Sequence, residues 1–192
     1  MSLSEAEACL AATEIVTRNA QRRRALELAA SLALPDAWLA AGFVRNAVWD
    51  ECFGVDNTVA DIDLVFFDTG DRSVARDRAL TDHLIASTGL PWSVKNQARM
   101  HSKHGHPAYR STWDAMRRWP EKQTAVAMRI GAREEVETLS CFGFRVLFNG
   151  RVEPNLACAH DVFLQRAKQK RWSQRWPGLI VACADCQAAP QA

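Results

Sequence analysis

Two short stretches decide the fold: Leu39-Ala40-Ala41-Gly42-Phe43-Val44-Arg45-Asn46, and Asp61-Ile62-Asp63-Leu64-Val65-Phe66-Phe67. In the first, an apolar run meets a glycine and continues with a helical pattern up to Gly54, which predicts a strand, a turn and a helix. The second is rich in β-forming residues and ends at Thr69-Gly70, so it predicts a strand. Together they indicate an α/β unit in which two carboxylates head a buried strand.

The paired aspartates Asp61 and Asp63 are the strongest candidates for chemistry. Strand side chains alternate between faces, so both aspartates point the same way while Ile62 turns into the core. Two neighbouring carboxylates repel each other unless a cation joins them, and Mg²⁺ prefers oxygen ligands while retaining waters that substrate phosphates can replace. An Asp-x-Asp by itself is more typical of a solvated strand end, but in the context of the glycine turn and helix upstream we predict a metal site for Mg²⁺ or Mn²⁺ at this pair.

A phosphate-binding turn is predicted next to the aspartates. Gly42 lets the backbone approach an anion closely, and the helix that follows offers free N–H groups and the positive end of its dipole. Arg45, on the first helical turn, can add a charge-assisted contact to phosphate. The alternative is that Gly42 only permits a tight turn.

Outside these stretches, hydrophobic periodicity predicts further helices and strands. A helical N-terminal segment over residues 4–34 begins with the capping-box spacing of Ser4 and Glu7. Residues 1–180 are expected to form one domain, and the small-residue stretch 181–192 a disordered tail. The other expected helices are 72–87, 111–119 and 161–176, and the other expected strands are 92–94, 124–130, 134–139 and 151–153.

Composition excludes several classes of protein. With 192 residues, 48% apolar residues and a net charge of +2, the chain fits a globular protein and not a disordered or disulfide-stapled one. The balanced charge means that any anionic partner must be met locally. Scattered cysteines and a polar start after Met1 predict a cytoplasmic protein with reduced thiols, and the lack of an apolar run long enough to span a bilayer predicts no membrane partner.

The two opening stretches resemble the signature of the DNA polymerase β-like nucleotidyltransferase superfamily, which includes the CCA-adding and poly(A)-adding enzymes. Further runs resemble a small bacterial group described as nucleotidyltransferase family proteins, and the resemblance extends over about residues 35–180. It implies a minimal nucleotidyltransferase fold of the α/β (α+β) class, with a short mixed β-sheet, flanking helices mainly on one side, and the site at the open ends of the first strands. The further runs are Val48-Trp49-Asp50, residues 92–101, Tyr109-Arg110-Ser111, Thr124-Ala125-Val126, and Lys170-Arg171-Trp172 with Trp176-Pro177.

The resemblance also implies a reaction, namely the Mg²⁺-dependent transfer of a nucleoside monophosphate from a nucleoside triphosphate to an acceptor hydroxyl. Asp61 and Asp63 would be the catalytic metal ligands. The acceptor stays open between an RNA end, a protein hydroxyl, a small molecule and another nucleotide. The residues implied to bind the nucleotide or its phosphates are Gly42, Arg45, Asn46, Lys95 and Arg99.

One departure from the superfamily pattern supports an alternative function. The superfamily often carries a third carboxylate on a neighbouring strand, and the matching slot between Trp92 and Val94 holds Ser93. Serine neither binds metal strongly nor acts as a general base. The alternative is therefore a nucleotide-binding or regulatory module of the same fold with weak or no catalysis.

A further alternative is RNA binding by the basic segment 168–176. Its two tryptophans, Trp172 and Trp176, are interleaved with Lys and Arg, a pattern that is compatible with stacking on bases. Because the two lie four residues apart in an expected helix, they share one face and are more typical of core residues.

Overall fold

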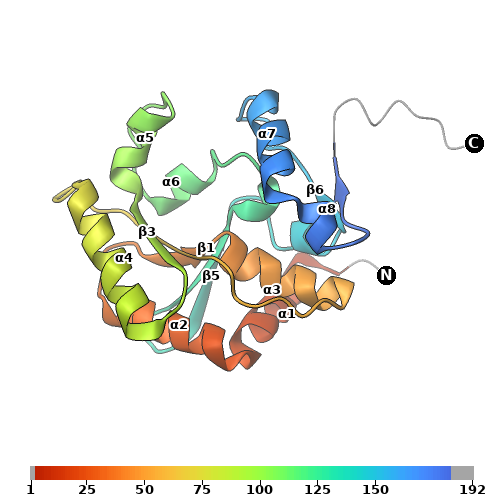
Figure 1. Cartoon of the computed structure of the whole chain (residues 1–192), viewed down its shortest axis with the longest axis horizontal. Coiled ribbons are helices and arrows are strands. Elements are labelled where there is room, and N and C mark those ends of the chain that lie inside the picture. Colours follow the sequence, from red (N-terminus) through yellow and green to blue (C-terminus); the bar gives the residue numbers. More distant parts are fainter. Residues whose placement is uncertain (1–2, 183–192) are drawn as a thin grey trace, which may run out of the picture.

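A five-stranded mixed sheet forms the centre of the protein in a computed structural model that describes residues 3–182 (Figure 1). The strand order is β3-β2-β1-β4-β5, with β2 and β3 parallel and all other neighbours antiparallel. The short mixed sheet expected from the sequence is confirmed. The strands are β1 (Trp38–Ala40), β2 (Ile62–Phe66), β3 (Trp92–Asn96), β4 (Val126–Ile130) and β5 (Val136–Ser140).

Four helices cover one face of this sheet: α1 (Glu5–Arg18), α2 (Ala20–Ser31), α3 (Gly42–Phe53) and α4 (Val74–Thr88). Ser4 and Glu7 form the predicted capping box at the start of α1. The single helical segment expected over residues 4–34 is two helices, because Asn19 leaves the helical conformation and its side chain accepts a hydrogen bond from the Arg22 N–H to cap α2. Within residues 3–182, none of the helices combines the length and apolar character needed to cross a bilayer.

The alternation of side chains along the strands builds two apolar layers. Leu39, Leu64 and Met128 lie in the larger layer, which packs against the first helices of the chain. Trp38 and Val65 lie in the smaller layer on the opposite face, together with Met116 of α6 (Thr112–Met116). Figure 1 shows α5 (Met100–Lys103), α6 and α7 (His160–Lys170) on this second side. The polar residues of the strands that face the second side are therefore the ones available for a site.

The C-terminal region packs onto α3. The helix expected over residues 161–176 breaks at Arg171, whose φ of 49° is left-handed, and divides into α7 and α8 (Trp172–Arg175). Trp172 and Trp176 turn onto Trp49 of α3, with ring centroids 6.2 and 5.0 Å away. Both are almost fully buried, which confirms them as core residues and leaves neither ring face free to stack on an RNA base.

The chain ends, as far as it is described, in a small second sheet. Strand β6 (Arg151–Val152) pairs in parallel with β7 (Ile180–Val181). Val181, the first residue of the expected tail, therefore lies in a strand opposite Val152. Ala182 follows it and donates its N–H to the Val152 carbonyl, and residues 183–192 of that expected tail lie outside the described residues.

Candidate active site

Antiparallel pairing of β1 with β2 brings the two deciding stretches of sequence together. Asp63 lies opposite Ala40 on β1 and opposite Ser93 on β3. Gly42, which begins α3, follows Ala40 by two residues. The N-terminus of α3 and the pair Asp61 and Asp63 therefore meet at one edge of the sheet.

The charge of Asp63 is poorly compensated. Burial and the neighbouring charge of Asp61 raise the pKa of Asp63 to about 6, against smaller lowering effects from Lys170, Arg45 and a hydrogen bond with Ser93. Asp61 precedes the strand and is more open, and its Oδ2 lies 3.5 Å from the Nζ of Lys170. The site thus holds two repelling carboxylates, one of them in a low-dielectric setting that disfavours its charge.

These two carboxylates fit a hard divalent cation. Their oxygens are the ligands that Mg²⁺ prefers, and a cation between them would relieve the repulsion that raises the pKa of Asp63. Among residues 3–182, no cluster of three or more His, Cys, Asp or Glu side chains is placed to hold a metal. Ser93 lies across from Asp63 on β3. Asp61 and Asp63 are therefore the residues here that could hold a divalent cation.

The turn before α3 is strained at Ala41. Its φ of 56° and ψ of −120° are unusual for a residue with a Cβ, whereas Gly42, where the sequence predicted the tight turn, does not have a positive φ. A Cβ at Gly42 would lie 3.1 Å from the side-chain amide nitrogen of Asn46. A side chain at Gly42 would therefore crowd Asn46, while Ala41 makes the turn.

The N-terminus of α3 has the features of an anion site. No side chain caps this helix. The first N–H groups of a helix have no acceptor within it, and together with the helix dipole they attract negative charge. Because Asp61 and Asp63 lie at the same edge of the sheet, an anion bound here would require a cation between it and the carboxylates.

Arg45 is buried and does not face solvent. It donates to Asn46 Oδ1 from Nε at 3.2 Å and from a terminal nitrogen at 2.9 Å, and to Thr124 Oγ1 at 2.8 Å. Its guanidinium lies over the rings of Trp49 and Trp172, 4.9 and 5.2 Å from their centroids. Burial lowers the pKa of Arg45 to about 10, while Glu121, Asp61 and Asp63 raise it. Arg45 is therefore a charged group inside the protein, close enough to the carboxylates for their charges to act on it.

Glu121, whose role the sequence did not reveal, anchors this interior. It is fully buried and accepts hydrogen bonds from Arg166 Nε at 2.5 Å and from Thr124 Oγ1 at 2.9 Å. Thr124 in turn accepts from Arg45. A chain of polar contacts thus runs from α7 to α3 through Glu121. The sequence around Glu121 looks like that of an exposed loop, so its role becomes visible only from the residues that contact it in the folded protein.

The two remaining predicted site residues, Lys95 and Arg99, lie in different surroundings. Lys95 is exposed, and its place opposite Val65 puts it on the same face of the sheet as Asp63 and Ser93. Arg99 forms an ion pair with the buried Asp77 of α4, whose carboxylate also accepts the Asn96 N–H at 3.1 Å. Lys95 therefore belongs to the site face, whereas Arg99 is held by α4.

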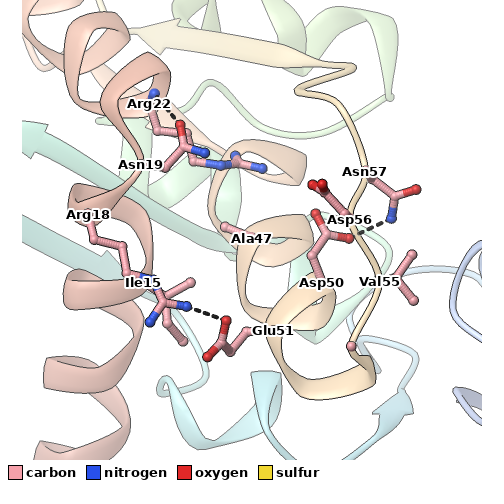
Figure 2. Close-up of a pocket in the computed structure, with 11 residues that line it drawn as sticks. Ile15, Arg18, Asn19, Arg22, Ala47, Asp50, Glu51, Val55, Asp56 and Asn57 are labelled. Atoms are coloured by element: carbon pink, nitrogen blue, oxygen red, sulfur yellow. Dashed lines mark hydrogen bonds and ion pairs between the residues drawn. The ribbon is translucent and has the colours of Figure 1, made fainter.

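A pocket of about 450 Å³ lies elsewhere, between the junction of α1 with α2 and the C-terminal half of α3 (Figure 2). Arg22 lines it, is buried, and donates to the Phe43 carbonyl. Asp50 lines it as well, and its Oδ1 accepts from Asn57 and Trp176. None of the sequence-predicted site residues lines this pocket, so it is separate from the edge of the sheet that holds the aspartates.

Comparisons with known proteins show the family and the fold of this chain. The model of a family described as "Nucleotidyltransferase" matches residues 27–181. A solved structure described as "The NMR structure of the protein reveals a CCA-adding enzyme head domain" has 30% sequence identity and a TM-score of 0.80, and the alignment covers 88% of this chain and 95% of that chain.

Larger solved proteins are also matched. A "tRNA-processing enzyme (apo form 2)" has 16% identity and a TM-score of 0.49, with 82% of this chain and 44% of that chain covered. "The complex structure of CCA-adding enzyme with ATP" has 15% identity and a TM-score of 0.46, with 79% of this chain and 37% of that chain covered. A comparison with curated protein sequences gave no match.

Proposed function

The chain belongs to the nucleotidyltransferase family, and we propose that it uses Mg²⁺ to transfer a nucleoside monophosphate from a nucleoside triphosphate to an acceptor hydroxyl. The observation that carries the proposal is the meeting of Asp61 and Asp63 with the uncapped N-terminus of α3 at one edge of the sheet. A carboxylate pair and an anion-binding helix end attract a metal ion and a phosphate chain, respectively.

Each residue of the site has a defined task in this proposal. Asp61 and Asp63 hold the divalent cation, which when bound neutralises the charge that develops on the phosphates. The first N–H groups of α3, beginning at Gly42, bind phosphate oxygens. Arg45 supplies a positive charge from within the protein, oriented by Asn46.

The acceptor would approach over the face of the sheet that carries Asp63 and Ser93. Lys95, exposed on the face that carries Asp63, is proposed to contact the triphosphate or the acceptor. Arg99 shares this proposed role and would have to exchange Asp77 for the ligand. An RNA 3′ hydroxyl is the first acceptor to test, because the similar structure at 30% identity is described as a CCA-adding enzyme head domain.

A thermal-stability screen tests the metal and nucleotide requirement. We expect at least one of ATP, GTP, CTP and UTP to raise the midpoint of unfolding in the presence of Mg²⁺ and not in its absence, because a ligand at a hundred times its Kd stabilises a protein by about 2.7 kcal/mol. The same nucleotides should leave an Asp63→Asn variant unchanged. If no nucleotide stabilises the wild-type protein at saturating Mg²⁺, the proposed activity is wrong.

Ser93 supports the alternative function, a nucleotide-binding module with little catalysis. If two carboxylates suffice, as we propose, the wild-type protein catalyses nucleotidyl transfer. Ser93→Asp should then change the rate by less than about tenfold, since a third carboxylate adds repulsion as well as a ligand. Pyrophosphate release measures this, with Ser93→Ala as the control for the lost hydrogen bond to Asp63. An inactive wild-type protein that gains turnover as Ser93→Asp would instead favour the alternative.

A further inference from the structure

Lys170 places an ammonium group beside the proposed metal ligands. Its Nζ lies 3.5 Å from Asp61 Oδ2, and both side chains remain accessible, with 44% and 39% of their surfaces exposed. The charge of Lys170 also acts on Asp63, whose pKa it lowers. Lys170 is thus a counter-ion of the carboxylate pair in this structure.

The fold holds Lys170 at this position from both sides. One helical turn earlier, Arg166 is bound to the buried Glu121. Two residues later, Trp172 is buried against Trp49 and the guanidinium of Arg45. Helix α7 ends at Lys170 because Arg171 takes a left-handed conformation. The lysine backbone is therefore fixed over the site, while its side chain is free to move.

The contact of Lys170 with Asp61 contributes little to the fold. Ion pairs between partly exposed side chains gain little Coulomb energy in a high dielectric and lose side-chain entropy. A divalent cation held by Asp61 would neutralise its carboxylate and weaken this contact. A phosphate chain bound at this site would offer Lys170 a new anionic partner, and the flexible four-carbon stem of lysine would let the ammonium follow it.

We propose that Lys170 is a triphosphate-binding residue that neutralises Asp61 in the ligand-free protein and exchanges this carboxylate for the phosphate chain when metal and nucleotide bind. This inference rests on the proposed function. It assigns to α7 a direct part in substrate binding that is independent of the base, because an ammonium donates to phosphate oxygens in any nucleoside triphosphate.

The first test measures metal binding without nucleotide. Mn²⁺ is titrated into the wild-type protein and the Lys170→Met and Lys168→Met variants, with free Mn²⁺ counted by electron paramagnetic resonance. Lys168 is an exposed lysine on the same helix, so its replacement removes the same charge at a distance from the site. Lys170→Met should bind Mn²⁺ about threefold or more tightly than wild type, since the competing ammonium is gone, and Lys168→Met should match wild type.

The second test measures phosphate binding without a base. Inorganic tripolyphosphate with Mg²⁺ is titrated calorimetrically into the same proteins and into Lys170→Arg. Lys170→Met should bind at least about tenfold more weakly than wild type, the loss expected for a charge-assisted hydrogen bond. Lys170→Arg, which retains a cationic donor, should recover most of the affinity.

Tighter Mn²⁺ binding together with weaker tripolyphosphate binding identifies the exchange, because a variant with a damaged structure would bind both ligands more weakly. If Lys170→Met equals Lys168→Met in either titration while wild type binds both ligands, the inference is overturned and the proposed function stands. If wild type binds neither Mn²⁺ nor Mg²⁺-tripolyphosphate, the proposed function fails and the inference fails with it.

Discussion

Replacing Asp63 with asparagine is expected to lower the rate of nucleotidyl transfer by at least about a thousandfold. Loss of a ligand from a two-carboxylate site leaves the cation held by Asp61 alone, and catalysis by positioned metal and phosphate charges depends on that hold. Release of pyrophosphate from a nucleoside triphosphate, in the presence of Mg²⁺ and an acceptor such as RNA, measures the effect.

The same variant is expected to be more stable than the wild-type protein when metal is absent. The pKa of Asp63 is raised to about 6 from 3.8. The contribution of this carboxyl group to the free energy of unfolding is therefore fully present below about pH 4 and is lost as the pH rises through 6. The difference of about two pKa units corresponds to at most roughly 3 kcal/mol above pH 7. Urea unfolding at pH 4 and pH 8 should therefore show a gain for Asp63→Asn only at the higher pH.

Two matched variants separate the catalytic from the electrostatic effect. Asp61→Asn also removes a proposed metal ligand, but Asp61 is more exposed. Activity should therefore fall without a comparable gain in the free energy of unfolding. Asp82→Asn removes an exposed carboxylate from α4 and should change neither property. Turnover of Asp63→Asn within tenfold of wild type would contradict the assignment of Asp63 as a metal ligand.

Replacing Glu121 with glutamine is expected to lower the free energy of unfolding by about 3 kcal/mol, the lower end of the range for breaking a buried ion pair. Glu121 is fully buried, and its charge is the largest compensation for the desolvated Arg45. Glutamine keeps nearly the same shape but leaves Arg45 and Arg166 without this carboxylate. Urea unfolding at pH 7 measures the loss as a lower midpoint with an unchanged slope.

A second, more exposed ion pair gives the control for this prediction. Glu153 accepts from Lys122 Nζ at 2.8 Å, with 27% and 32% of the two side chains exposed. Because water reaches this pair, Glu153→Gln should cost less than about 1 kcal/mol. An equal effect of the two substitutions would show that the burial of Glu121 does not set its contribution.

The sequence was informative wherever the chemistry is local. The Asp-x-Asp at the head of a β-rich run, the glycine before a helix and the capping box of Ser4 and Glu7 each predict local structure from neighbouring residues, and the structure has the strand, the helix and the cap in these places. The family resemblance carried by the same runs agrees with the matched family. The breaks at Asn19 and Arg171 were missed because a single residue that leaves the helical conformation does not interrupt the apolar periodicity on either side.

What the sequence by itself determined is the set of short-range elements. Asp61 and Asp63 stay candidate metal ligands, chosen because alternation in an extended segment predicts that both face the same way, although Asp61 lies just before β2. Only the tertiary structure decided that Arg45 lies inside the protein between Trp49 and Trp172. It also decided that Glu121 holds α7 in place and that Lys170 reaches Asp61. These contacts join residues far apart in the chain, and their energies depend on burial and distance, which a pattern of neighbouring residues does not contain.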